Sequence, residues 1–336
     1  MKRPFGVVLS AVLLILGSLL QLLFALFMAL GGVYVQHQMP PGEGSAAPLP
    51  VWMPTFICIF SAAFLLLAAW ALATAVGLLK LRRWARYSVL VIGGGLALIG
   101  LLSFFFMVLL MFIPLPVPAT VEASQVHGVQ TFTRVLFGVM AVFYAAIGAV
   151  GASWLVYFSR QQVCALFADA PGSPAESRPP TLITVIAGLS ILSAGSMLLM
   201  SFSPLPAAFF GWILYGWAKA AYYGLYIALE AGVGVGLWRM RKWGLNLALG
   251  VKGCTLLYLL ILTAFPSLLL RYHALVQQGL AQPAQLSPQF HLAFYRTVMA
   301  FSAALTAAIL AVLIHHRKAF EEPVKTELEA SAPLES

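Results

Sequence analysis

The sequence has few charged residues, and this scarcity limits the class of protein that it can encode. Of its 336 residues, 9% are charged and 62% are hydrophobic, whereas a soluble domain usually carries about 25% charged residues. The interior of a water-soluble fold is too small to bury this much apolar surface. The composition therefore excludes an ordinary soluble domain and indicates a protein of the lipid bilayer.

Aspartate and cysteine are also rare, and many catalytic and metal sites depend on them. Asp169 is the sole aspartate, so a site of paired aspartates is excluded. Cys58, Cys164 and Cys254 do not have the spacing of a disulfide framework or a zinc motif. The histidines are scattered, and neither a phosphate-binding loop nor an H-E-x-x-H motif occurs. The sequence therefore predicts no cofactor and no metal, and it leaves enzyme function uncertain but less favoured.

The sequence contains long apolar runs with few charged residues. A bilayer core about 30 Å thick is crossed by about 20 apolar residues in a helix, and a helix satisfies its own backbone hydrogen bonds. The first run is too long for the apolar region of a cleaved signal peptide. The fold predicted is all-α, a polytopic membrane protein with about eight transmembrane helices. Its apolar runs are 5–35, 54–79, 87–114, 132–158, 181–203, 212–238, 244–270 and 292–314.

The net charge of +9 comes from basic residues near the ends of the apolar runs. Because they form no single patch, the charge does not indicate nucleic-acid binding, and the partners expected are the lipid bilayer and other membrane proteins. Basic residues concentrate in the cytoplasmic loops of membrane proteins. The short connections at 80–86 and 239–243, the first residues of the chain and the end of the last apolar run at 317–318 are basic. This pattern predicts a multi-pass protein of the cell membrane with both termini in the cytoplasm.

An internal repeat divides the chain. The segment from Gly77 to Trp84 reads GLLKLRRW, and the segment from Gly236 to Trp243, 159 residues later, reads GLWRMRKW. The same offset relates Phe106 to Phe265 and 139–141 to 298–300. Self-similarity at a fixed offset indicates duplicated structural units. We therefore expect two parallel four-helix repeats, 1–160 and 181–318, with a cytoplasmic linker at 161–180 and a polar cytoplasmic tail at 319–336.

Both basic segments contain the pattern G-L-x-x-x-R-x-W. In this pattern the sequence resembles bacterial multi-pass membrane proteins of uncharacterised activity, so the resemblance implies a cytoplasmic hairpin and no reaction. The arginines can reach lipid phosphates, and tryptophan favours the membrane interface. Arg82 and Trp84, and likewise Arg241 and Trp243, are therefore the expected anchors at the cytoplasmic interface.

Glu230 and Lys252 are the charges most clearly inside apolar runs. Each lies 11 residues from Arg241, on opposite sides of the basic turn, so in an antiparallel hairpin both are about 16 Å from the turn at 1.5 Å per residue. The equivalent positions of the first repeat hold Ala71 and Gly93, so both charges are absent there together. The sequence predicts an intramembrane ion pair, which could orient two helices or couple to ion or proton movement.

Three functions remain open on these observations. The first, which we favour, is a non-enzymatic scaffold, assembly factor or envelope-homeostasis component. The second is a transporter or channel that uses the Glu230–Lys252 pair. The third is a membrane-embedded enzyme that acts on an anionic lipid through basic residues near the outer side. The candidate outer anion contacts are Arg134, Lys219, Arg271 and Arg296.

Overall fold

The computed structural model describes most of the chain. The described residues are 4–38, 52–112, 123–167, 180–203, 206–210, 212–265, 267–268, 270 and 288–320. Nearly all of the expected linker beyond 167 and the tail from 321 therefore lie outside the described residues, as does Arg271.

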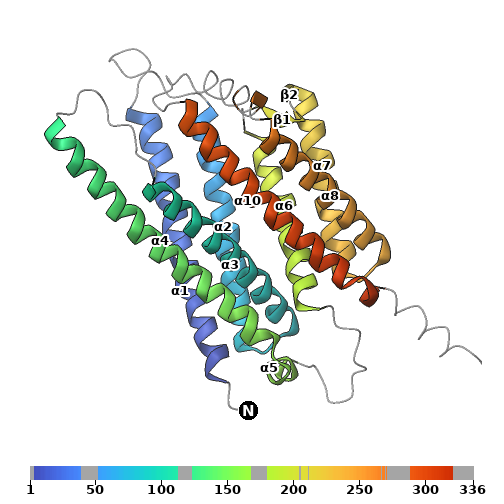
Figure 1. The fold of residues 1–336 in the computed structure, drawn as a ribbon. Coiled ribbons are helices and arrows are strands. Elements are labelled where there is room, and N and C mark those ends of the chain that lie inside the picture. The colour runs from blue at the N-terminus through green and yellow to red at the C-terminus, as the bar shows by residue number, and fades with distance from the viewer. Residues whose placement is uncertain are drawn as a thin grey trace, which may run out of the picture.

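The described chain is a helical bundle with one short β-hairpin (Figure 1). Eight of its helices are long and apolar enough to cross a membrane, which confirms the all-α polytopic class. The elements in chain order are α1 (Phe5–Gln38), α2 (Trp52–Leu79), α3 (Arg83–Phe112), α4 (Ala123–Ser159), α5 (Gln161–Leu166), α6 (Thr181–Ser201), β1 (Ala207–Phe209), β2 (Trp212–Leu214), α7 (Gly216–Trp238), α8 (Lys242–Ala264), α10 (Pro288–His315) and the 3-10 helix η1 (Arg317–Phe320).

The structure differs from the expected helix pattern in the apolar run at 212–238. Its first residues form strand β2, which pairs antiparallel with β1 in the register Ala207 to Leu214. The helix starts only at Gly216, whose φ of +53° is a left-handed conformation that glycine adopts without strain. Continuous apolar character does not distinguish a short strand from the start of a helix, so the sequence did not reveal this hairpin.

A second difference lies at the start of the expected linker, where α5 forms. This short helix lies against the first four helices, because Val163 and Phe167 belong to the same buried cluster as Phe158. The ring centroids of Phe158 and Phe167 are 6.2 Å apart. Residues 161–167 are thus packed structure rather than open linker.

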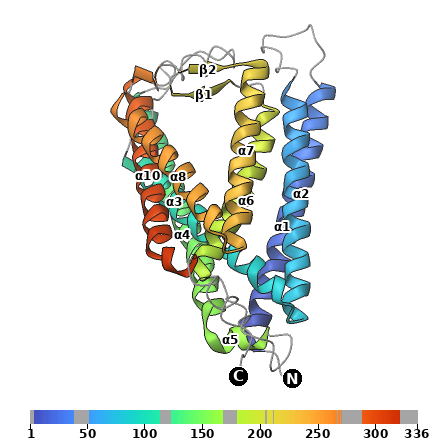
Figure 2. The same ribbon diagram turned by 90° about the vertical axis from the view of Figure 1, so that its right-hand side faces the viewer.

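The two ends of the bundle differ in charge. The start of α1, helix α5, η1 and the turns α2–α3 and α7–α8 all lie at one end, and the β-hairpin lies at the other (Figures 1 and 2). We call these the basic end and the β-hairpin end. The basic end carries Lys80, Arg82, Arg83, Arg86, Arg160, Arg239, Arg241, Lys242, Arg317 and Lys318.

Each half of the bundle packs by the same scheme. In the first half α1 packs on α2 and α3 on α4, with α2 and α3 joining the two pairs; in the second half α6 packs on α7 and α8 on α10, with α7 and α8 joining them. Each half also has a buried apolar cluster, which includes Leu78 in the first and Leu237 in the second. These two leucines are separated by the offset of 159 residues.

Burial along α2 and α7 follows the offset of 159 residues. The buried positions of α2 from Ala71 onward recur in α7 at the same offset, where Glu230 replaces Ala71. The α2 set is Ala71, Thr74, Ala75, Gly77 and Leu78, and the α7 set is Glu230, Val233, Gly234, Gly236 and Leu237. In the last helix of each half the offset is 162 instead, because Ala141 and Gly151 on α4 are buried like Ala303 and Leu313 on α10. The same offset relates buried Phe158 at the end of α4 to buried Phe320 on η1.

The turn between α2 and α3 is a Schellman motif, a hydrogen-bonded helix ending. The Arg82 N–H donates to the Gly77 carbonyl over 2.9 Å, and the Leu81 N–H donates to the Leu78 carbonyl over 3.0 Å. Leu81 has a φ of 53°, a left-handed conformation that glycine usually occupies at this position. A leucine here is therefore a distinctive local feature.

The turn between α7 and α8 repeats this motif at the same offset. The Arg241 backbone N–H donates to the Gly236 carbonyl over 3.0 Å, and the Met240 backbone N–H donates to the Leu237 carbonyl over 3.1 Å. Met240, again not a glycine, has a φ of 51°. The common turn, packing scheme and burial pattern support the duplication, which stays a prediction.

The two halves meet through α3 and α6. Glycines make close contacts there: a Cβ on Gly94 would collide with Val185, and a Cβ on Gly188 would collide with Val91. Small residues allow helices to approach closely inside a membrane, where packing rather than water drives association. This contact joins one half to the other within one chain.

The interface leads to a prediction about a divided chain. Residues 1–171 and 172–336, co-expressed with an affinity tag on one part, should copurify from membranes, because the α3–α6 contact does not need the covalent linker. Gly188→Leu should abolish copurification, since the added side chain would occupy the space of Val91. Gly195→Leu is the matched control, because Gly195 lies on the same helix with open space around its Cβ position. Halves that never associate would contradict the division at 161–180.

Candidate functional site

The structure brings Glu230 and Lys252 into direct contact. The Lys252 ammonium donates to both oxygens of the Glu230 carboxylate, at 2.6 Å to Oε1 and 2.9 Å to Oε2. Such charge-assisted hydrogen bonds are stronger than neutral ones. The contact lies between α7 and α8, on either side of the Schellman turn, as the equal spacing from Arg241 requires. These two helices are therefore joined by a turn at one point and by an ion pair at another.

The two partners of the pair are buried to different degrees. The Glu230 side chain is 0% exposed, whereas the Lys252 side chain is 14% exposed. The Tyr226 side chain, one turn earlier on α7, lies close to Glu230 and to Ser193 on α6. A small polar cluster thus links α6, α7 and α8. An isolated charge in lipid is costly, and here each charge has its counter-charge.

Repeat-equivalent positions in the first half use different contacts. Ala71 is buried at the position equivalent to Glu230. Gly93, equivalent to Lys252, faces the backbone of Gly151 and the side chain of Trp154 on α4. The first half therefore packs small residues closely where the second half has an ion pair.

The structure describes three of the four candidate outer anion contacts, and these three lie on three different helices. Lys219 is buried, and its ammonium donates to the backbone carbonyl of Ser203, which lies just beyond the end of α6. Lys219 thus connects the segment that follows α6 to the start of α7. Arg134 and Arg296 are exposed on α4 and α10, and Arg271 lies outside the described residues.

The four predicted interface anchors lie at the two basic turns. Trp84 and Trp243 are 49% and 52% exposed, which leaves ring surface available to the lipid headgroup region. Arg82 and Arg241 have exposed side chains, while their backbone N–H groups close the Schellman turns. The geometry is compatible with anchoring, which stays a prediction.

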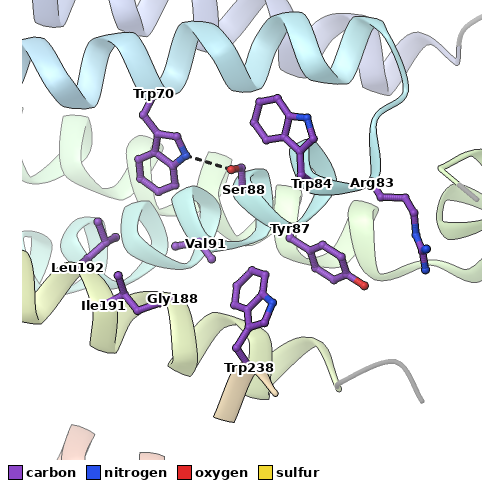
Figure 3. A pocket seen from close by; sticks show the side chains of 10 residues that line it. All are labelled: Trp70, Arg83, Trp84, Tyr87, Ser88, Val91, Gly188, Ile191, Leu192 and Trp238. Atoms are coloured by element: carbon purple, nitrogen blue, oxygen red, sulfur yellow. Dashed lines mark hydrogen bonds between the residues drawn. The ribbon is translucent and has the colours of Figure 1, made fainter. Parts of the chain in front are cut away.

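A pocket of about 720 Å³ lies between the two halves near the basic end (Figure 3). Helices α2 and α3 supply one side, and α6 and the last residue of α7 supply the other. Its lining residues are Trp70, Arg83, Trp84, Tyr87, Ser88, Val91, Gly188, Ile191, Leu192 and Trp238. Apart from Trp84, none was singled out from the sequence. One signal was available, because Trp70 and Ser88 lie nine residues before and after Leu79 and are therefore at similar depth.

Among the described residues, no three His, Cys, Asp or Glu side chains come together in a group that could hold a metal ion. No family model, no curated protein and no solved structure matches the chain. The class is therefore defined by the fold itself: an integral, multi-pass α-helical membrane protein that contacts the lipid bilayer.

Proposed function

We propose that this chain is a non-enzymatic scaffold or assembly component of the cell membrane. The observation that carries the proposal is the closed ion pair: the Lys252 ammonium holds both oxygens of the fully buried Glu230 carboxylate. Charges engaged in this way neutralise one another and orient α7 against α8. Lys219 is used similarly, since its ammonium donates to the Ser203 carbonyl, just beyond the end of α6. The polar chemistry of these helices thus serves to hold them together.

A transporter is the second candidate, and the polar neighbours of Glu230 favour it. Tyr226 and Ser193 extend the ion pair into a cluster across three helices, and chains of polar groups inside membranes mark proton and ion pathways. In this function Glu230 must exchange its proton or its partner during each cycle, whereas in the scaffold the pair stays closed.

Reaction with dicyclohexylcarbodiimide, an apolar reagent that modifies protonated carboxyl groups, separates the two functions. In membranes at neutral pH, peptide mapping by mass spectrometry should find Glu230 unmodified in the scaffold, because both carboxylate oxygens are held by Lys252. Lys252→Met removes this partner, so Glu230 should become reactive. Modification of Glu230 in the unaltered chain would support the transporter instead.

We further propose that the basic end faces the cytoplasm, because basic residues are retained on that side. Single cysteines at Gly44, Ser124 and Gln278 should then react with a membrane-impermeant maleimide added outside intact cells. Cysteines at Gly172 and Leu334 should react only after the cells are permeabilised. The native cysteines are first replaced by alanine. Labelling at Gly172 from outside would refute the eight-helix arrangement with the basic end in the cytoplasm.

A further inference from the structure

The pocket between the two halves changes character along its length. Arg83 begins α3 and Trp238 ends α7, so both lie beside the basic turns. Val91 is eight residues farther along α3, about 12 Å deeper at 1.5 Å per residue. Figure 3 shows Ile191 and Leu192 at the opposite end of the pocket from Arg83. The pocket is therefore cationic at its mouth and aliphatic at depth.

Aromatic side chains form the walls between these two ends, and contacts hold them in place. The Trp70 indole N–H donates to the Ser88 hydroxyl over 3.0 Å. The rings of Tyr87 and Trp238, one from each half, meet edge to face with centroids 5.6 Å apart. Tryptophan and tyrosine favour the headgroup level of a membrane. The pocket is thus largely formed before any ligand enters, at a depth where headgroups meet acyl chains.

The positive charge at the mouth of the pocket favours an anionic ligand. Arg83 lines the pocket, and Lys80 and Arg82 line a neighbouring groove on the other side of Trp84. A guanidinium group has the planar geometry to bind a phosphate through two hydrogen bonds. A ligand with an anionic phosphate and an apolar chain therefore matches the pocket at both ends.

We propose that this pocket binds one anionic phospholipid from the leaflet at the basic end. Its phosphate lies at Arg83, and the upper part of an acyl chain lies along Val91, Ile191 and Leu192. The pocket volume is within the range of about 300–1,000 Å³ typical of small-molecule sites. A lipid bound here contacts α2 and α3 of one half and α6 of the other, so it bridges the two halves.

The second half does not supply an equivalent set of side chains. At the offset of 159 residues, Arg83 corresponds to Lys242, Tyr87 to Asn246 and Ser88 to Leu247. The Tyr87 ring and the Ser88 hydroxyl therefore have no counterpart there, although Trp84 has one in Trp243. Lys242 provides a matched control, because it carries the same charge at the equivalent turn and does not line the pocket.

The proposal is tested on the full chain in detergent by native mass spectrometry, titrated with phosphatidylglycerol or phosphatidylcholine. We expect the first phosphatidylglycerol to bind more tightly than phosphatidylcholine. Arg83→Gln should weaken its binding about tenfold, or about 1.4 kcal/mol, and Lys242→Gln should change it less than twofold. Equal losses in the two variants would show general attraction to a basic surface and would overturn the proposal.

Two further measurements distinguish binding of a lipid from binding of a free anion. Leu192→Trp, which fills the deep end, should weaken phosphatidylglycerol binding at least fivefold, and an unchanged dissociation constant would contradict the placement of the chain. Inorganic phosphate should not displace the lipid at equal concentration; displacement would mean that the site recognises the anion alone. Circular dichroism verifies the fold of each variant, and the Arg83–Lys242 comparison decides the outcome if Leu192→Trp does not fold.

Discussion

Glu230→Ala is expected to lower the free energy of unfolding by about 1–4 kcal/mol, because it leaves the Lys252 ammonium without its counter-charge. Lys252→Ala should have an effect of similar size, since it leaves a fully buried carboxylate unpaired. The stranded group will neutralise or draw in water, which limits the loss. Unfolding in mixed micelles of increasing dodecyl sulfate content, followed by circular dichroism, measures each change.

The double variant Glu230→Ala with Lys252→Gly introduces the residues that the first repeat has at these positions. Because it removes both charges, it should recover much of the stability that either single variant loses. Strictly additive losses would mean that the two side chains are not energetically coupled. In a scaffold the double variant should also reverse the phenotype that deletion of the gene produces. In a transporter, stability should return but the deletion phenotype should persist.

Gly100→Ala is expected to destabilise the protein by about 1–3 kcal/mol through overpacking. A Cβ at Gly100 would collide with the backbone of Gly148 and meet the carbonyl oxygen of Tyr144 at 2.8 Å. Backbone atoms cannot rotate away as a side chain can, so α3 and α4 must separate. The same detergent titration measures the change.

Gly95→Ala is the matched control on the same helix. Its Cβ would meet the Leu189 side chain at 3.8 Å, an ordinary van der Waals contact. Alanine also has a higher helix propensity than glycine, so this variant should be neutral or slightly more stable. Equal destabilisation by the two variants would show that general loss of glycine, and not the α3–α4 contact, is responsible.

The sequence was sufficient for features that depend on short segments. Helix existence follows from the length of each apolar run, and the Glu230–Lys252 contact follows from equal spacing about one tight turn. Both arguments involve one helix or one hairpin, where the geometry is fixed by the rise per residue. The structure adds the bidentate contact and the full burial of Glu230, which spacing alone does not determine.

Features that depend on packing between distant segments were not predictable in this way. The pocket requires the contact of Gly188 with Val91 and of Tyr87 with Trp238, and each pair joins the two halves. Lys219 was a candidate anion contact because of its charge, but its ammonium donates to Ser203, a partner that becomes apparent only when the end of α6 is located. The β-hairpin was missed because its residues are as apolar as the helix that follows.

The closed ion pair has a consequence for how the chain enters the membrane during synthesis. When α7 leaves the ribosome, α8 is still unmade, so Glu230 has no counter-charge. Insertion of a helix with an unpaired central charge is unfavourable by about 2.5–3.5 kcal/mol on insertion-based scales. Helix α7 is therefore best released into lipid together with α8, as a preassembled hairpin in which Glu230 and Lys252 are already paired. The repeat-equivalent helix α2, which has Ala71 at this position, can enter alone.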